Sequence, residues 1–381
     1  MNIKLDSKEL SKAMEKIAAI IPSPQQQNAI VFQGTNEKKV ILQVVREGIS
    51  ARLFLNCIET NADEDDYLII DGLLFNAYVK QLADIGEIEI ENDFDKDKIN
   101  ITYKKGKLDI NQLAEKCYIA YPTYQDKKQI MQVAGGTFQK LIDKTSYVIN
   151  KTEKRTIIKS LKFESTMVMK SLSAMGTDGF RLAYGKCDII SGEDVSFIVL
   201  SSLIDYVSKC VDTEEEVTFS ITGNSLIVET TQIQIIIGLT NGDYPNLERI
   251  IHANYTEKIV FECDKDNIIQ ALKRVGVLAN STETKAIKLV GKQEEFLGSI
   301  LQISSTTEKG NNVEDIVIKV KEGDITTLKI AANSNFFLQA LEKASDTIVL
   351  TLEPNKPIKI VNAEDYDENY VAVILPIKVT N

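Results

Sequence analysis

The sequence predicts an α+β protein built from three tandem homologous domains, each with two helices packed on antiparallel sheet. An amphipathic helix pattern recurs three times at a period of about 130 residues, and a second helix pattern follows it at nearly the same period. Both patterns have the i, i+3, i+4, i+7 spacing that buries one face of a helix. Solenoid repeats run only about 20–50 residues, so each repeat is expected to be a whole domain. The expected domains are residues 1–126, 127–255 and 256–381.

The two helices of each repeat are marked by four apolar or small residues apiece. The first helices carry Leu10, Ala13, Met14, Ile17; Phe138, Leu141, Ile142, Thr145; and Ile268, Ala271, Leu272, Val275. The second helices carry Phe75, Tyr78, Val79, Leu82; Leu203, Tyr206, Val207, Cys210; and Phe337, Ala340, Leu341, Ala344.

Strands flank the helices in every repeat. Alternating stretches after the second helix, at 87–90, 215–221 and 347–352, predict strands with one solvated face. Turn residues at 222–224 and 353–357 predict hairpins after two of these strands. A short strand also opens each repeat, and a residue suited to an N-cap precedes each first helix. These strands are 3–5, 130–133 and 259–263, and the caps are Ser7, Thr137 and Asp266.

The helices are basic although the chain is acidic. Lys and Arg number 44 against 55 Asp and Glu, which gives a net charge of −11 and ordinarily argues against a nucleic-acid partner. Positions about 200° around the helix from the first marker face away from the core. Five of six such sites on the first helices are basic, and the second helices add two more lysines. These residues are Lys12, Lys16, Lys140, Lys144, Arg274, Lys209 and Lys343. They indicate either an ordinary solvated face or a surface that holds a polyanion without sequence preference.

No pattern in the chain supports catalysis, a metal or another cofactor. The only histidine, His252, has no neighbouring nucleophile, and Gly135 and Gly136 lack the Lys and Ser/Thr that a phosphate loop needs. The acidic run at 63–66 is read as a solvated loop, although it has ligands for a hard cation. The five cysteines are odd in number and widely spaced, as in reduced cytoplasmic proteins. Neither a signal peptide nor a membrane span is expected.

Three segments resemble the bacterial sliding clamps, the ring-shaped beta subunit of the replicative DNA polymerase. They are Gly-Thr-Asp-Gly-Phe-Arg-Leu-Ala at 176–183, Gly-Asp-Tyr-Pro-Asn-Leu-Glu-Arg-Ile at 242–250, and Val-Ala-Val-Ile-Leu-Pro-Ile-Lys-Val at 371–379. The helix at 271–278 is similar to the family's third-domain helix. The resemblance covers the whole chain and is weakest in the first domain. Phe180, Thr284 and the loop from Pro22 to Gln27 depart from the family pattern, which indicates a divergent member.

The resemblance implies a DNA-clamp fold and a ring. Two subunits would close head to tail, with twelve helices facing a hole that takes duplex DNA without sequence preference. The basic helix faces would line this hole. At the joint, Leu108 and Ile110 of one subunit would meet Val277 and Leu278 of the other, and Leu108, Asp109 and Ile110 alternate as an edge strand does.

The resemblance also implies a pocket for short peptide motifs of the polymerase and of a clamp loader, containing a glutamine followed by Leu or Phe. Apolar side chains would form the groove, Gly179 would admit a peptide backbone, and Arg181 and Arg249 would anchor carbonyls or a carboxylate. The residues carried over are Ile158, Thr177, Gly179, Arg181, Leu182, Pro245, Arg249, Ile250, Asn333, Phe336, Val373, Leu375, Pro376 and Ile377.

A three-domain scaffold that binds protein partners without encircling DNA is the alternative. It keeps the repeat and the lack of catalytic residues, but it leaves the repeated lysines unexplained. An enzyme is a more distant third reading.

Overall fold

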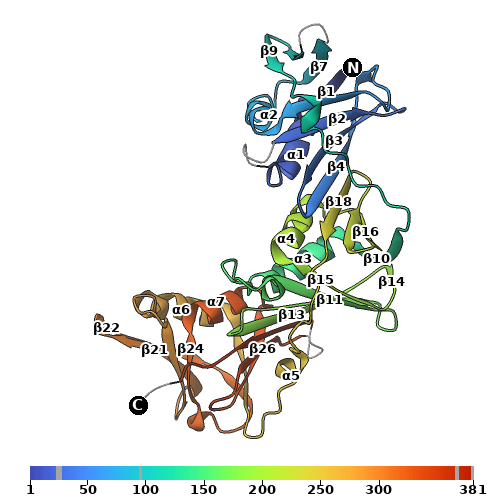
Figure 1. Cartoon of the computed structure of the whole chain (residues 1–381). Helices are drawn as coiled ribbons and strands as arrows, with labels where there is room; N and C mark the ends of the chain where they lie inside the picture. The colour runs from blue at the N-terminus through green and yellow to red at the C-terminus, as the bar shows by residue number, and fades with distance from the viewer. Residues whose placement is uncertain (23–27, 94–96, 365–368, 379–381) are drawn as a thin grey trace. The chain divides into compact units, whose positions relative to one another are not determined.

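The computed structural model describes residues 1–22, 28–93, 97–364 and 369–378, so most of the loop from Pro22 to Gln27 lies outside it. The chain forms two compact units (Figure 1). Unit 1 comprises Met1–Gly136, Ile190–Gly192 and Ser202–Leu239, and unit 2 comprises Thr137–Ile189, Glu193–Ser201 and Thr240–Asn381.

Unit 1 contains two antiparallel sheets. The first has five strands in the order β5-β1-β7-β8-β9, and the second has nine in the order β14-β10-β16-β17-β18-β4-β3-β2-β6. The strands of the first sheet are β1 (Asn2–Asp6), β5 (Glu59–Thr60), β7 (Glu87–Asp93), β8 (Lys98–Tyr103) and β9 (Gly106–Asn111). Those of the second are β2 (Ala29–Gly34), β3 (Lys39–Arg46), β4 (Ile49–Asn56), β6 (Tyr67–Asp71), β10 (Lys128–Ala134), β14 (Ser191–Gly192), β16 (Glu216–Thr222), β17 (Ser225–Glu229) and β18 (Ile233–Gly238).

The nine-stranded sheet of unit 1 joins two repeats. Its strand β18 belongs to the second repeat and pairs with β4 of the first, with Ile235 opposite Ala51. The backbone hydrogen bonds of the sheet therefore continue from one repeat into the next, which satisfies both edge strands.

Unit 2 repeats this construction. It has a nine-stranded sheet in the order β15-β11-β12-β13-β27-β26-β25-β19-β23 and a four-stranded sheet in the order β22-β21-β20-β24. Here β13 of the second repeat pairs with β27 of the third. The larger sheet consists of β11 (Ser160–Thr166), β12 (Ser171–Thr177), β13 (Arg181–Asp188), β15 (Val195–Leu200), β19 (Ile259–Asp264), β23 (Lys319–Glu322), β25 (Thr347–Leu352), β26 (Ile358–Asn362) and β27 (Tyr370–Ile374). The smaller consists of β20 (Ala286–Glu294), β21 (Gly298–Thr307), β22 (Gly310–Val317) and β24 (Lys329–Asn333).

The expected helices are present. The first helices of the repeats are α1 (Ser7–Ala18), α3 (Gly135–Ser146) and α6 (Lys265–Ala279), and the second are α2 (Gly72–Val79), α4 (Ser201–Cys210) and α7 (Ser334–Glu342). Short helical segments are η2 (Glu115–Cys117), η3 (Thr156–Lys159), α5 (Glu248–Ile251) and η4 (Ile325–Thr327).

The predicted N-caps of the first helices are wrong. Asp6 caps α1, because its carboxylate accepts hydrogen bonds from the backbone N–H groups of Lys8 and Glu9 at 2.9 and 3.2 Å. Asp264, and not Asp266, caps α6. The third helix starts at Gly135, before the expected Thr137. Each cap was misplaced because two or more residues suited to an N-cap stand near each helix start.

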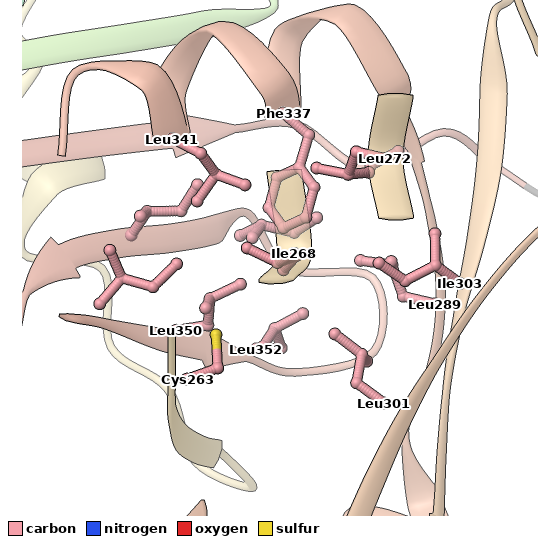
Figure 2. Close-up of a cluster of buried hydrophobic side chains, with 14 of the residues drawn as sticks. Cys263, Ile268, Leu272, Leu289, Leu301, Ile303, Phe337, Leu341, Leu350 and Leu352 are labelled. Atoms are coloured by element: carbon pink, nitrogen blue, oxygen red, sulfur yellow. The ribbon is translucent and has the colours of Figure 1, made fainter. Parts of the chain in front are cut away.

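The core of the third repeat shows how the helix markers pack. Phe337 and Leu341 of α7 and Ile268 of α6 point towards Leu350 and other strand side chains (Figure 2). All four of these side chains are fully buried. Each contributes about 1.5–3 kcal/mol by leaving water.

The apolar faces of the other helices are mostly buried as the sequence predicts, although Tyr78 on α2 is only partly buried. On α4, Leu203 is only partly buried while its neighbour Ile204 is fully buried. The predicted hairpin turns are also present. Gly223 lies between β16 and β17 and Asn355 between β25 and β26, with φ angles of 52° and 63° that favour Gly and Asn.

Within the described part of the chain, no helix is long and apolar enough to cross a membrane. The five cysteines are free thiols, of which Cys57, Cys210 and Cys263 are buried.

Candidate functional site

A tight turn in unit 2 explains the residue types of the 176–183 segment. Thr177 ends β12 and its hydroxyl donates to the Arg181 carbonyl at 2.7 Å while it accepts the Gly179 N–H at 3.0 Å. The Asp178 carboxylate accepts the backbone N–H groups of Phe180 and Arg181, both at 3.0 Å. Gly179 has φ of 89°, which an L side chain rarely adopts. The turn is therefore fixed by its own side chains, and it leaves Phe180 64% exposed.

The Arg181 side chain connects this turn to two other segments. Its Nε donates to Asp178 at 3.0 Å, and its guanidinium lies 4.3 Å from the centre of the Phe336 ring. The other two nitrogens donate to Gln339 on α7 and to the carbonyl of Tyr147. With only 9% of its side chain exposed, Arg181 organises the site. The expectation that it also anchors a ligand remains a prediction.

Tyr147, whose carbonyl accepts a hydrogen bond from Arg181, forms a largely buried hydrogen-bonded pair with Tyr370. The hydroxyls of Tyr147 and Tyr370 are 2.9 Å apart, and Tyr370 donates to the Ala340 carbonyl on α7 at 2.7 Å. Burial raises the pKa of Tyr147 to about 12, so this phenol stays neutral and keeps its hydrogen bond across the physiological range.

Several of the predicted pocket residues gather in and around one buried hydrophobic cluster. Leu182 pairs with Val373 between β13 and β27, and both lie in one cluster with Ile250. Leu375 donates its N–H to the Phe180 carbonyl at 2.9 Å, and Ile377 donates to Ala331 at 2.8 Å. The segment after β27 is thereby held beside the turn.

The remaining members of the predicted pocket have other placements. Asn333 caps α7, where its carboxamide oxygen accepts the N–H groups of Asn335 and Phe336. Ile158 is buried in η3, whereas Arg249 in α5 is exposed. Pro245 and Pro376 are half-buried. All fourteen predicted residues lie in unit 2.

The basic helix positions face away from the core, as predicted. Lys12, Lys140, Lys209 and Arg274 are exposed, and the other three are half-buried. In unit 1, Lys12, Lys16 and Lys209 line one hollow of about 590 Å³ between α1 and α4.

Three of the basic side chains have acidic partners. Lys16 pairs with Asp212 at 3.1 Å, Lys343 pairs with Asp143, and Arg274 donates two hydrogen bonds to Glu314 at 2.8 and 2.7 Å. These pairs reduce the charge that the helices offer to a polyanion. Among the described residues, Lys12, Lys140, Lys144 and Lys209 have no carboxylate partner. Lys144 is half-buried, and the other three are exposed.

Of the two predicted contact regions for a second subunit, one lies on an outer strand and the other near the end of helix α6. Leu108 and Ile110 are on β9, the outer strand of the five-stranded sheet, as expected. Val277 is 74% exposed near the end of α6, and Leu278 next to it is half-buried. Sequence reasoning missed β22, the outer strand of the four-stranded sheet, although it packs against α6.

No group of three or more His, Cys, Asp and Glu residues within the described ranges could hold a metal ion.

Three joined repeats with basic helices, a preformed surface turn and unpaired edge strands define a clamp-type binding protein. The comparisons with known proteins identify the family. Residues 132–246 match the family described as DNA polymerase III beta subunit, central domain, and residues 248–378 match its C-terminal domain. The chain belongs to the DNA polymerase III beta subunit family, the beta sliding clamps.

The relatives and the solved structures that resemble this chain are named sliding clamps or DNA polymerase III beta subunits. The beta sliding clamp of Streptococcus pneumoniae is 23% identical over 368 residues, covering 92% of this chain and 93% of the relative. That of Staphylococcus aureus is 22% identical over 359 residues, covering 92% and 89%. The structure of the Bacillus subtilis sliding clamp matches with a TM-score of 0.88 at 21% identity, and that of the Thermotoga maritima beta subunit with 0.85 at 17%, each covering 100% of both chains. The expected clamp fold is confirmed.

Proposed function

We propose that this chain is a sliding clamp that closes head to tail as a homodimer around duplex DNA and tethers the replicative polymerase. Family membership supports this proposal, since the relatives carry the name beta sliding clamp. The protein would act in the cytoplasm as a processivity subunit, without a cofactor and without catalytic residues of its own.

The proposal of a ring rests on how the strands pair at the joints between repeats. At the joint inside unit 1, the fourth strand of the first repeat, β4, pairs with the last strand of the second repeat, β18. At the joint inside unit 2, the equivalent strands β13 and β27 pair in the same way. The fourth strand of the last repeat is β22 and the last strand of the first repeat is β9, and each is an outer strand. A second copy supplies the missing neighbour for each, which closes a ring.

DNA binding rests on the repeated basic positions. Contacts from flexible lysines to phosphates carry no sequence information and exchange easily, which suits a ring that slides. The exposed, unpaired lysines Lys12, Lys140 and Lys209 contribute most in this proposal. The half-buried Lys144 and the ion-paired Lys16, Arg274 and Lys343 contribute less. A clamp loader is needed, because a closed ring cannot thread onto a circular duplex.

The peptide site is proposed at the Arg181 turn. The buried Leu182 and Val373, with half-buried Ile250 packed against them, would form the floor of a groove for a Leu or Phe side chain. Exposed backbone around Gly179 would accept hydrogen bonds from a glutamine. A short disordered motif binds such a surface weakly, so that polymerase and loader exchange.

Native mass separates this proposal from the scaffold alternative. Sedimentation equilibrium at micromolar concentration should give twice the 42.5 kDa chain mass. A monomer across the whole concentration range would contradict the ring and favour the scaffold.

A further inference from the structure

An ion pair spans the joint between the first and second repeats. Lys16 on α1 meets Asp212, which follows α4, at 3.1 Å. Their side chains are 19% and 52% exposed, so the lysine is largely covered by the joint. The first helix of one repeat is thus linked to the end of the second helix of the next.

The joint between the second and third repeats is also spanned by an ion pair. Asp143 on α3 meets Lys343 at the end of α7, with side-chain exposures of 65% and 25%. The same two helices are linked, but the charges are exchanged. The position used is shifted by one residue on the first helix and by three, about one helical turn, on the second.

The positions equivalent to both ion pairs can be found on α6, the first helix of the third repeat, and after α2, the second helix of the first repeat, by counting from the helix markers. Arg274 follows Ile268 by the same interval as Lys16 follows Leu10. Asp84 follows Phe75 by the same interval as Asp212 follows Leu203. The positions equivalent to Asp143 and Lys343 are Lys273 and Gln81, which cannot form an ion pair. Only the Lys16–Asp212 type of pair is therefore possible at a third joint.

We propose that Arg274 of one subunit forms an ion pair with Asp84 of the partner subunit, at each of the two joints that close the ring. This inference rests on the proposed head-to-tail dimer. The partner surface is a second copy of this chain, and the contact lies beside the β22 and β9 edges.

The side chains of Asp84 and Arg274 are more exposed than the equivalent side chains at the joint between the first and second repeats. The Asp84 side chain is 91% exposed, with Lys8 at 3.8 Å, and Arg274 is 55% exposed. Their counterparts in the closed joints, Asp212 and Lys16, are exposed by only 52% and 19%.

Two hydrogen bonds to Glu314 orient the Arg274 guanidinium and leave donors for this contact. This carboxylate on β22 takes one N–H from Nε and one from Nη2, which leaves three of the five guanidinium donors for a second carboxylate. Glu314 is therefore a positioning residue, and the arginine bridges an acidic group on each side of the joint.

A charge-reversal cycle tests the pair. The variants are Arg274→Glu, Asp84→Arg and the double variant, and the dimer dissociation constant is measured by sedimentation at low and high salt. Each single reversal should weaken the dimer by about tenfold at low salt, because both joints gain a repulsion. The double variant should return to within about threefold of the parent, and the differences should shrink at high salt.

Lys273→Glu is the matched control, since it reverses a charge on the same helix opposite an uncharged Gln81. It should change the dissociation constant by less than about twofold. Single effects that simply add in the double variant, or a Lys273 effect as large as the Arg274 effect, would overturn the ion pair while leaving the ring intact. A parent chain that never dimerises would instead overturn the proposed function together with this inference.

Discussion

The guanidinium of Arg181 lies 4.3 Å from the centre of the Phe336 ring and pairs with Asp178 beneath it. Replacing Arg181 with Ala leaves the nearly buried Asp178 carboxylate without its partner. The expected loss in the free energy of unfolding is about 3 kcal/mol, measured by urea denaturation. Arg249→Ala, at an exposed site, is the control and should cost no more than about 0.5 kcal/mol. Equal small losses for both would show that Arg181 does not organise the turn.

Peptide binding is expected to depend on the segment after β27. Removing residues 377–381 deletes the Ile377 N–H that bonds to Ala331 and frees the chain beside the turn. Fluorescence anisotropy should then detect no binding of a Gln-containing clamp-binding peptide, while sedimentation still shows a dimer. Removing only 379–381, which lie outside the described residues, is the matched control and should retain binding. Affinity that survives the longer truncation would place the site elsewhere.

The subunit joint should fail when an apolar contact is replaced by a charge. Leu278 is half-buried at the end of α6, so Leu278→Asp is expected to yield a folded monomer by light scattering. Circular dichroism checks that the variant keeps its fold. A variant with the parent's dimer mass would remove Leu278 from the interface.

Lys12, Lys140 and Lys209 are expected to dominate phosphate attraction. Changing all three to Glu should weaken DNA association and lower the slope of log affinity against log salt by about 0.9 for each phosphate that the protein no longer neutralises. The melting temperature should stay unchanged because these side chains are exposed. Lys319, Lys329 and Lys356, exposed on strands and a turn, form the control triple. An equal effect of both triples would show that only net charge matters.

Four thiols are expected to be unreactive in the folded protein. Burial raises the pKa of Cys57 and Cys210 to about 11, and of Cys187 and Cys263 to about 12. At pH 8 this leaves about a hundredfold less thiolate than in the unfolded chain for Cys57 and Cys210, and about a thousandfold less for Cys187 and Cys263. Alkylation followed by mass spectrometry should therefore be slow until urea is added. Equal rates with and without urea would contradict this burial.

The same pKa shifts give a direction for stability. A raised thiol pKa favours the folded state fully below the ordinary value of 9.0, and this contribution is lost as the pH rises through about 11 to 12.

The sequence predicted the helices well because their buried faces repeat at a spacing that only a helix satisfies. Leu10, Phe138 and Ile268 are all fully buried or nearly so. The shift from Leu203 to Ile204 on α4 occurred where two adjacent apolar residues compete for one buried position.

Strand pairing could not be predicted in the same way. Alternation predicts individual strands such as β7 and β16, but it does not say which strands are neighbours. The pairing of β4 with β18, neither of which was among the expected strands, is decided by tertiary packing across repeats. The roles of Tyr147, Gln339 and Tyr370 around Arg181 were missed for the same reason, because segments far apart in the chain bring them together.

The central claim is that the chain closes into a ring around DNA, and retention on circular DNA tests it most directly. The protein is loaded onto a nicked circle with a clamp loader, washed at high salt, and quantified before and after the circle is linearised. The account predicts that the clamp stays on the circle and is lost once the DNA has ends, whereas Leu278→Asp is lost from both. Retention that is unaffected by linearisation, or loss from the intact circle, would contradict the ring.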